Sequence, residues 1–367
     1  MKTNVNLQKI SDLDKVISML NKNQIIAIQI APGVRVAIGE EFGFDIGQNV
    51  VGKLVTALKK AGFKYVYDVC AGADFTIIEE SKELVRRIKT GKNLPLFTSC
   101  CPIWVKYLEM VKPDYKNNLS TCKSPTEMLS TLIKYFSPNI KVVSVTPCVG
   151  KKIERERDNN IDVSLTTREC AQLIKLKNID FYNLKEGQFD DLFGVSSGAG
   201  NIFGVTGGVM EAVLRTTVHL LNNDKTSILE VKNNNSIKDY EIPLKTIRTN
   251  DDIREITIPT NKCDLKIAIV NGIASAKRLF EEIEKGKIYH FVEFQNCKGG
   301  CIMGPGQPYV DKNKYTLDKV VKLRGTGLYD IDKTTKIKTS HSNQNILGIY
   351  GQIGEKQMQE MLHLKNE

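Results

Sequence analysis

Six runs rich in valine and isoleucine constrain the fold of this chain more than any other feature. Amphipathic stretches of helical length, such as residues 73–92 and 124–136, separate most of them. The runs are IIAIQIA (25–31), KYVYDVC (64–70), LPLFTSC (94–100), IKVVSVTPC (140–148), LKIAIVNG (265–272) and HFVEFQNC (290–297). Strands that alternate with helices predict an α/β fold, in which mainly parallel sheets are flanked by helices.

Two segments fall outside this alternation. Residues 223–263 are polar and rich in asparagine, which predicts a peripheral insertion or hairpin. Residues 310–367 are expected to form a C-terminal helical segment of short helices over the surface. Because no internal repeat or long linker interrupts the chain, residues 1–367 are predicted to form a single domain with two lobes.

Composition limits the partners. The chain has 367 residues, of which 41% are hydrophobic and 26% charged, as in ordinary globular proteins. No apolar stretch approaches the roughly 18 residues of a membrane span, and the polar start lacks a signal peptide, so we expect a cytoplasmic protein without a membrane span. The net charge of +10 is spread among acidic residues rather than gathered in a stripe. This charge distribution argues against a nucleic-acid partner and is compatible with a small acidic protein as partner.

Cysteines stand at the ends of four of the six runs, at Cys70, Cys100, Cys148 and Cys297. Ligands of open α/β sheets bind beyond the carboxyl ends of the strands, so these residues lie where a site would form. Nine cysteines in a chain without a secretory signal favour metal binding or chemistry over disulfides.

Three loops carry the densest signals, TSCCPIW (98–104), TPCVGKKIERER (146–157) and CKGGCIMGPGQP (297–308). Their cysteines are adjacent or spaced C-x3-C, which does not fit the paired C-x2-C spacing of structural zinc sites. A cubane iron–sulfur cluster asks only for four thiolates that the fold brings together. Cys101, Cys148, Cys297 and Cys301 are candidates. The glycines of the third loop are typical of backbone that passes close to a bulky inorganic ligand.

The neighbouring Cys100 needs a different explanation. Successive side chains of an extended segment point to opposite faces, so Cys100 and Cys101 do not readily bind one small cluster. A thiol can carry protons near neutral pH, but most free cysteines are small buried hydrophobic residues, and the pattern alone favours that role. Similarly, the spacing of Glu80, Glu83 and Arg87 alone favours a solvated helix face with one ion pair.

These three loops, in this order, resemble the signature segments of iron-only, or [FeFe], hydrogenases. Further segments that are similar to this family extend over nearly the whole chain. They are APGVRVAIGEEFG (31–43), GADFTIIEE (72–80), LSTCKSPTEML (119–129), LTTRE (165–169), IFGVTGGVMEAVLRT (202–216) and LRGTGLYDID (323–332). The resemblance implies a two-lobed catalytic domain with its cluster between the lobes. Since this chain begins without ferredoxin-like domains, we expect an external electron carrier such as ferredoxin.

The resemblance also implies the cofactor and the reaction. The family's H-cluster is a [4Fe–4S] cubane joined to a diiron subcluster that bears carbon monoxide, cyanide and azadithiolate and is built by dedicated maturation enzymes. By resemblance, Cys101, Cys148, Cys297 and Cys301 bind the cubane, and Cys301 bridges to the diiron subcluster. The implied reaction is the reversible reduction of protons to dihydrogen.

Roles for other residues follow from the same resemblance. Cys100 matches the family's proton-carrying thiol, and the relay to the surface continues through Glu80, Ser120, Glu83 and Arg87. Lys151 matches a lysine that donates to a cyanide ligand, and Glu154 is expected to orient it. Residues that match the lining of the diiron pocket are Ala31, Pro32, Ser124, Pro125 and Phe203.

Four positions depart from the family pattern: Pro305 interrupts a run of glycines, Thr126 stands where glutamine is common, and two more replace methionine. Thr146 and Gln295 stand where methionine is usual, so each replaces a polarizable thioether by a hydrogen-bonding side chain and is expected to tune the cofactor. A slow hydrogen-sensing relative therefore stays open. An iron–sulfur assembly factor without hydrogen chemistry is less expected, because such proteins generally lack the cysteine at position 100.

The remaining cysteines have no implied role. We expect buried structural thiols at Cys70, Cys122, Cys170 and Cys263.

Overall fold

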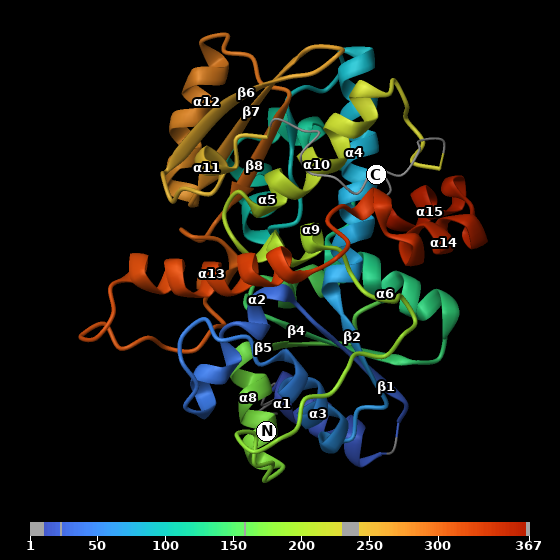
Figure 1. The fold of residues 1–367 in the computed structure, drawn as a ribbon, viewed down its shortest axis with the longest axis vertical. Coiled ribbons are helices and arrows are strands. Elements are labelled where there is room, and N and C mark those ends of the chain that lie inside the picture. The colour runs from blue at the N-terminus through green and yellow to red at the C-terminus, as the bar shows by residue number, and fades with distance from the viewer. Residues whose placement is uncertain (1–10, 23, 158, 230–241, 365–367) are drawn as a thin grey trace, which may run out of the picture.

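The computed structural model describes residues 11–22, 24–157, 159–229 and 242–364, and two four-stranded sheets organise this part of the chain (Figure 1). The first sheet has the order β2-β1-β4-β5 and is parallel throughout. The second has the order β3-β8-β7-β6, in which only β6 runs antiparallel to its neighbour. The strands are β1 (Ile26–Ile30), β2 (Tyr65–Asp68), β3 (Leu96–Phe97), β4 (Lys141–Thr146), β5 (Val163–Thr166), β6 (Ile253–Pro259), β7 (Asp264–Asn271) and β8 (Phe291–Gln295). The predicted α/β fold with mainly parallel sheets is confirmed.

The chain passes between the two sheets more than once. It places β1 and β2 in the first sheet, β3 in the second, β4 and β5 in the first again, and β6 to β8 in the second. Each of the six predicted runs contains one strand, whereas β5 and β6 were not predicted as strands. Strand β6 belongs to the segment 223–263, of which residues 230–241 lie outside the described residues.

Amphipathic helices cover the sheets because each presents an apolar side to a sheet face. Leucines and isoleucines of α1, α3 and α8 pack on one face of the first sheet, and α6 packs on the other. In the second lobe, Trp104 of α5 stacks on Phe294 of β8 with ring centroids 3.6 Å apart, while α10 covers the opposite side. The long helix α4 runs from the first lobe alongside the second (Figure 1).

The longer helices are α1 (Asp12–Asn21), α3 (Val51–Ala61), α4 (Val69–Thr90), α5 (Pro102–Val111), α6 (Pro125–Phe136), α8 (Thr167–Leu176), α10 (Gly208–Asn222), α12 (Ala276–Glu284), α13 (Leu317–Thr334), α14 (Gln344–Ile353) and α15 (Glu355–Leu362). Short helices are α2 (Pro32–Arg35), α7 (Lys151–Arg157), α9 (Gly198–Asn201) and α11 (Leu244–Ile247). The 3-10 turns are η1 (Ile38–Phe42), η2 (Pro113–Asn118), η3 (Ile202–Gly204), η5 (Ile273–Ser275), η6 (Cys301–Met303) and η7 (Ser340–Ser342). None of the helices in the described ranges is long and apolar enough to cross a bilayer.

The C-terminal helices are tied into both lobes. Arg324 of α13 is buried and pairs with Glu40 at 2.6 Å. Eight residues later, Asp332 pairs at 2.7 Å with the fully buried Arg215 of α10. The sequence favoured short helices over the surface for 310–367, but α13 has 18 residues and buries these two charged side chains. Their partners lie on different lobes, so α13 braces one lobe against the other.

Candidate functional site

The three cysteine-bearing loops follow the carboxyl ends of β3, β4 and β8, and they meet between the sheets. Cys101 stands directly before α5, Cys148 follows β4, Cys297 follows β8, and Cys301 begins η6. Burial raises the pKa of the Cys301 thiol well above its ordinary value, and the charges of Cys101, Cys148 and Cys297 raise it further. The four predicted ligands are therefore within electrostatic reach of one another.

Close backbone contacts hold two of these loops together. The amide of Gly306 donates to the carbonyl of Pro147 at 2.8 Å. A Cβ at Gly304 would lie 2.3 Å from that same carbonyl oxygen, and one at Gly300 would lie 2.6 Å from the amide nitrogen of Thr206. Gly300 also has a φ of +94°, which side-chain-bearing residues rarely adopt. Glycine is therefore required where the loops approach each other.

The spread of the four thiols distinguishes a cluster from a single ion. Four thiolates around one zinc ion, at about 2.3 Å from the metal, would lie about 3.8 Å apart. Among the described residues, the only metal-ligating group of three or more side chains with its ligand atoms within 4.8 Å is Glu83, Cys122 and His363. The four cysteines thus surround a wider space than one ion needs, and this donor set fits a cubane, which requires four thiolates around a larger body.

Cys100 contacts a different set of groups. Its carbonyl accepts a hydrogen bond from Lys151 Nζ at 3.1 Å. Burial raises the pKa of the Cys100 thiol well above its ordinary value, and the carboxyl group of Glu80 raises it further. The side chain therefore holds its proton at neutral pH and faces Glu80.

Hydrogen bonds join three of the predicted relay residues, Ser120, Glu83 and Arg87, and Glu80 lies close enough to interact with them electrostatically. Burial raises the pKa of Glu80 to about 8, against a hydrogen bond with Ser120 that lowers it. Ser120 Oγ donates to Glu83 Oε2 at 3.2 Å, and Arg87 donates to Glu83 Oε1 through Nε at 3.1 Å and Nη2 at 2.6 Å. The side chains of Glu83 and Arg87 are only 1% and 7% exposed. The solvated helix face that the spacing alone favoured is wrong, because α4 packs between other elements along this side.

Lys151 lies between the cysteine loops and a pair of buried acids. Its Nζ donates to both carboxylate oxygens of Glu154, at 2.7 and 2.8 Å, and Ser124 Oγ donates to Glu154 Oε2 at 2.9 Å. Burial alone would lower the pKa of Lys151, but Glu154 and Glu127 raise it. The ammonium group therefore stays charged beside the candidate cluster site.

The other predicted residues lie on separate elements. Ala31 and Pro32 begin α2, Pro125 follows Ser124 at the start of α6, and Phe203 lies in η3. All are buried. Thr146 Oγ1 donates to the carbonyl of Cys148 at 3.3 Å.

Only one of the two polar atoms of the Gln295 side chain has a hydrogen-bond partner among the described residues. Its Nε2 donates to the carbonyl of Val205 at 3.4 Å, while its buried Oε1 has no hydrogen-bond partner within the part of the chain that the structure describes. This acceptor stands at the end of β8, two residues before Cys297.

Sequence reasoning missed a network that continues from Glu83 toward the C-terminus. Thr121 donates to Glu83 Oε2 through its amide and its hydroxyl, each at 3.1 Å. His363 contacts Thr121 Oγ1 through Nδ1 at 2.7 Å and Glu79 Oε2 through Nε2 at 2.9 Å. Cys122 joins this network. No spacing rule relates residues some 280 positions apart, so only the fold reveals it.

Of the other three cysteines, two are buried structural thiols as expected. Cys70 accepts a hydrogen bond from Arg35 at 3.2 Å, and Cys170 lies in the apolar core of the first lobe. Cys263 is only partly buried, near the turn between β6 and β7.

The match to known proteins is extensive. The family described as "Iron only hydrogenase large subunit, C-terminal domain" matches residues 24–305. The chain belongs to the iron-only, or [FeFe], hydrogenase family. A second family, "Iron hydrogenase small subunit", matches residues 318–365, which contain α13 to α15. This [FeFe]-hydrogenase chain thus carries both parts.

Several curated proteins are similar to this chain over most of its length. Iron hydrogenase 1 of Clostridium pasteurianum is 37% identical over 98% of this chain and 64% of the relative. The NADP-reducing hydrogenase subunit HndD of Solidesulfovibrio fructosivorans is 34% identical over 94% of this chain and 60% of the relative. The chain therefore spans somewhat less than two thirds of these proteins. Protein NAR1 of Arabidopsis thaliana is similar at 30% identity over 88% of this chain.

Solved structures agree. The [FeFe]-hydrogenase HydA1 from Chlamydomonas reinhardtii superimposes with a TM-score of 0.79 at 31% identity, covering 96% of this chain and 98% of that one. A structure of HydA that concerns stepwise assembly of the H-cluster matches equally well, at 0.79 and 30% identity. The family binds the H-cluster, and this chain has its fold.

Proposed function

We propose that this protein catalyses the reversible reduction of protons to dihydrogen, 2H⁺ + 2e⁻ ⇌ H₂, at an H-cluster. The buried line of side chains that starts at Cys100 and Glu80, which influence each other electrostatically, and continues through the hydrogen-bonded Ser120, Glu83 and Arg87 carries the proposal. An iron–sulfur scaffold needs four cysteines but has no use for a buried proton relay that begins beside them.

The cluster-binding residues have distinct tasks in this proposal. Cys101, Cys148, Cys297 and Cys301 would hold the cubane, with Cys301 shared with a diiron subcluster supplied by maturation enzymes. The bound H-cluster supplies the redox chemistry, and the protein positions it and delivers protons. Lys151, kept charged by Glu154, would donate to an anionic ligand of the diiron subcluster.

Proton delivery is the task of the buried side chains. Cys100 holds a proton beside the cluster site, and Glu80 passes protons between Cys100 and Ser120. A group with a pKa of about 8 both accepts and gives protons readily near neutral pH, which suits Glu80 to an intermediate position. Glu83, paired with Arg87, connects this line to the loop at Thr121.

An acidic ferredoxin is the proposed electron donor. Next to the predicted cluster ligands Cys148 and Cys297, the surface exposes Val149 and Ile153, and the side chain of Lys298 is 60% exposed and pairs with the exposed Asp252 at 3.1 Å. An apolar centre with a basic neighbour suits a small acidic partner.

Salt tests this docking. We expect the KM for ferredoxin to rise with ionic strength, because screening weakens attraction between exposed charges. Turnover with reduced viologen, a small cationic donor, serves as the control and should not show the same loss. A KM for ferredoxin that does not change with salt would contradict electrostatic docking.

A slow hydrogen-sensing relative is the second candidate. The polar Thr146 and the unpartnered amide oxygen of Gln295 favour it, because hydrogen-bonding groups near a metal cofactor tune its potential and ligand basicity. The similarity to a probable cytosolic Fe–S cluster assembly factor of Nematostella vectensis, 29% identical over 76% of this chain, keeps an iron–sulfur assembly role as a third, weaker candidate.

One experiment separates the three. We would record infrared spectra of anaerobically matured protein and measure hydrogen evolution from reduced viologen in the same sample. Carbonyl and cyanide bands with rapid gas production are expected. The same bands with little gas would favour the sensor, and no bands after maturation proven on a control hydrogenase would refute the proposed function.

A further inference from the structure

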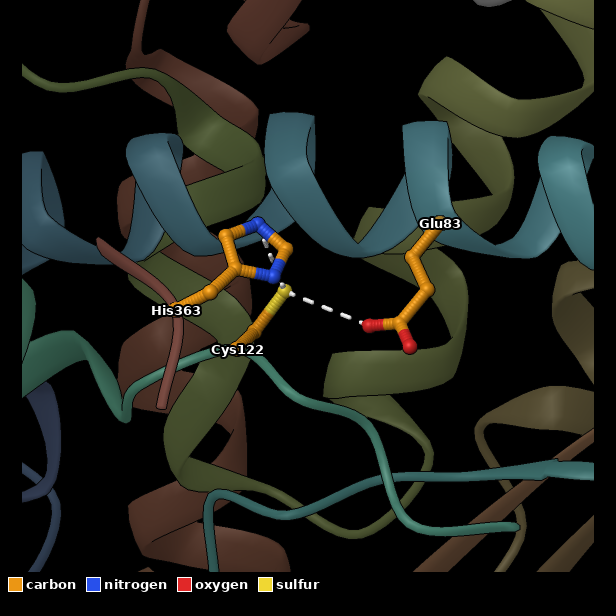
Figure 2. A group of neighbouring side chains, drawn as sticks. All are labelled: Glu83, Cys122 and His363. Carbon is orange, nitrogen blue, oxygen red and sulfur yellow. Dashed lines mark hydrogen bonds between the residues drawn. The ribbon is translucent and has the colours of Figure 1, made fainter. Parts of the chain in front are cut away.

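A second group of ligand-type side chains lies at the far end of the proposed relay. Figure 2 shows Glu83, Cys122 and His363 turned toward one another from three separate parts of the chain. Glu83 belongs to α4, Cys122 to the loop before α6, and His363 follows α15. Glu83 and Cys122 are buried and His363 is partly so, with 11% of its side chain exposed.

The distances suit a single metal ion. Cys122 Sγ lies 3.8 Å from Glu83 Oε2 and 3.8 Å from His363 Nε2, and all three ligand atoms lie within 4.8 Å of one another. Around a tetrahedral zinc ion, with a thiolate at about 2.3 Å and an imidazole at about 2.05 Å, sulfur and nitrogen stand about 3.6 Å apart. The observed pairs need to close by only a few tenths of an ångström.

The backbone fixes two of the three ligands before any ion binds. Cys122 and His363 form an antiparallel bridge. On either side of it, the amide of Lys123 donates to the carbonyl of Leu362 at 2.9 Å, and the amide of Leu364 donates to the carbonyl of Thr121 at 2.7 Å. The segment that carries Cys122 is thus held in register with the segment that carries His363.

The imidazole is oriented as well. Thr121 Oγ1 contacts Nδ1, which leaves Nε2 directed at Cys122 and at Glu79 Oε2. In metal sites, the second ring nitrogen of a histidine ligand is held by such a hydrogen bond. Glu79, 2.9 Å from Nε2, offers a further carboxylate close to the fourth position.

The local charge favours a dication. Two carboxyl groups lie directly at the site, Glu83 beside Cys122 and Glu79 beside His363. Carboxylates at these positions attract a divalent cation, and the cation in turn stabilises the Cys122 thiolate. Arg87 binds Glu83 mainly at Oε1, whereas the oxygen that faces Cys122 is Oε2.

We propose that Glu83, Cys122 and His363 bind a divalent cation of the zinc class, and that the bound ion blocks the proton relay. The ligand set of one thiolate, one imidazole and one carboxylate suits zinc, with water or Glu79 in the fourth position. Binding forms one metal–sulfur, one metal–nitrogen and one metal–oxygen bond, and it releases to solvent the Cys122 thiol proton and the Nε2 proton that His363 shares with Glu79. Since Ser120 Oγ donates to the same Glu83 Oε2, the ion takes that oxygen out of the relay. This second half rests on the proposed function.

Metal binding is tested apart from catalysis. The probe is Zn²⁺, titrated by calorimetry into protein that already holds its clusters, with zinc-edge X-ray absorption to identify the ligands. We expect one ion per chain with one sulfur ligand. Cys122→Ser and His363→Gln should each weaken binding at least about tenfold, since even supporting residues of metal sites cost that much. Matched controls are Cys170→Ser in the apolar core and His290→Gln, which lies in the second lobe.

The effect on turnover is measured on the same samples. Zn²⁺ should inhibit hydrogen evolution by the wild-type protein, a chelator should restore it, and Cys122→Ser should resist inhibition at the zinc concentration that saturates wild type. Unchanged affinity in both ligand variants would overturn the site. Tight binding at the site without inhibition would overturn the blocking of the relay. If the protein evolves no hydrogen at all, the proposed function fails while the calorimetry still decides the site.

Discussion

The proposed role of Glu80 as a proton carrier has a consequence for the free energy of unfolding that can be measured. The carboxyl group of Glu80 is buried, and its pKa rises from 4.5 to about 8. Between these values the folded chain holds one proton more than the unfolded chain, so stability falls as the pH rises through that window. From pH 4.5 to pH 7 the interval is about 2.5 units, and at about 1.36 kcal/mol per unit the loss is about 3 kcal/mol.

The substitution Glu80→Gln should remove this loss. An amide keeps a hydrogen bond to Ser120 but cannot ionise, so the variant should exceed the wild type in stability by about 3 kcal/mol at pH 7 and by little near pH 4.5. The same change should lower hydrogen turnover by about 10²- to 10⁴-fold, because a proton-transfer group is lost. Urea unfolding followed by circular dichroism at pH 5, 7 and 9, on both proteins in the same cluster state, measures the stability difference.

The preceding residue provides an internal control of opposite sign. Glu79 is buried to the same degree, but hydrogen bonds and charge from His363 and Lys82 outweigh burial and lower its pKa. Glu79→Gln should therefore destabilise the protein at pH 7. If Glu80→Gln showed no gain at pH 7, or if its gain did not grow between pH 5 and 7, Glu80 would be ionised in the folded protein and the relay argument would fail.

Three further substitutions test other parts of the site. Cys100→Ala should leave the infrared bands of the cofactor in place and reduce turnover by about 10²-fold or more, and undiminished turnover would refute its proton-carrying role. Lys151→Ala should lower the content of diiron subcluster, measured as carbonyl band intensity per cubane, because an anionic ligand of the subcluster would lose its charged donor. Lys152→Ala is the control, and equal retention in both would count against a role for Lys151. Asp332→Ala should destabilise the fold by about 1–3 kcal/mol in urea, since the fully buried Arg215 loses one of its two carboxylate partners and keeps Glu211. The exposed Asp330→Ala should have little effect, and equal effects would argue against the ion pair.

The sequence predicts the fold well where strands are long or strongly apolar. All six runs contain strands, because buried parallel strands need continuous apolar residues. Strand β5 escaped because its sequence, VSLT, alternates apolar and hydroxyl side chains and offers no continuous apolar run, and β6 escaped because an antiparallel edge strand alternates polar and apolar side chains like a peripheral hairpin. The pairing order, in which β3 joins β8, depends on contacts nearly 200 residues apart that no local pattern encodes.

The sequence also predicts some residues of the candidate site and not others. Cys101, Cys148, Cys297 and Cys301 could be selected from strand ends and glycine-rich spacing alone. The relay could not, because the Glu83 and Arg87 spacing is that of any solvated helix, and only tertiary packing buries it. His363 gave no signal, since its partners Glu79 and Thr121 lie far away in sequence.

The repeated passage of the chain between the two sheets has a mechanical consequence. A protein whose lobes are separate halves of the chain can open about a single hinge, but here β3 lies in one sheet while β2 and β4 lie in the other, and α13 braces both lobes. Wide opening would have to bend several crossing segments together. Such a scaffold suits the proposed reaction, because protons, electrons and dihydrogen can pass between side chains without any opening of the lobes.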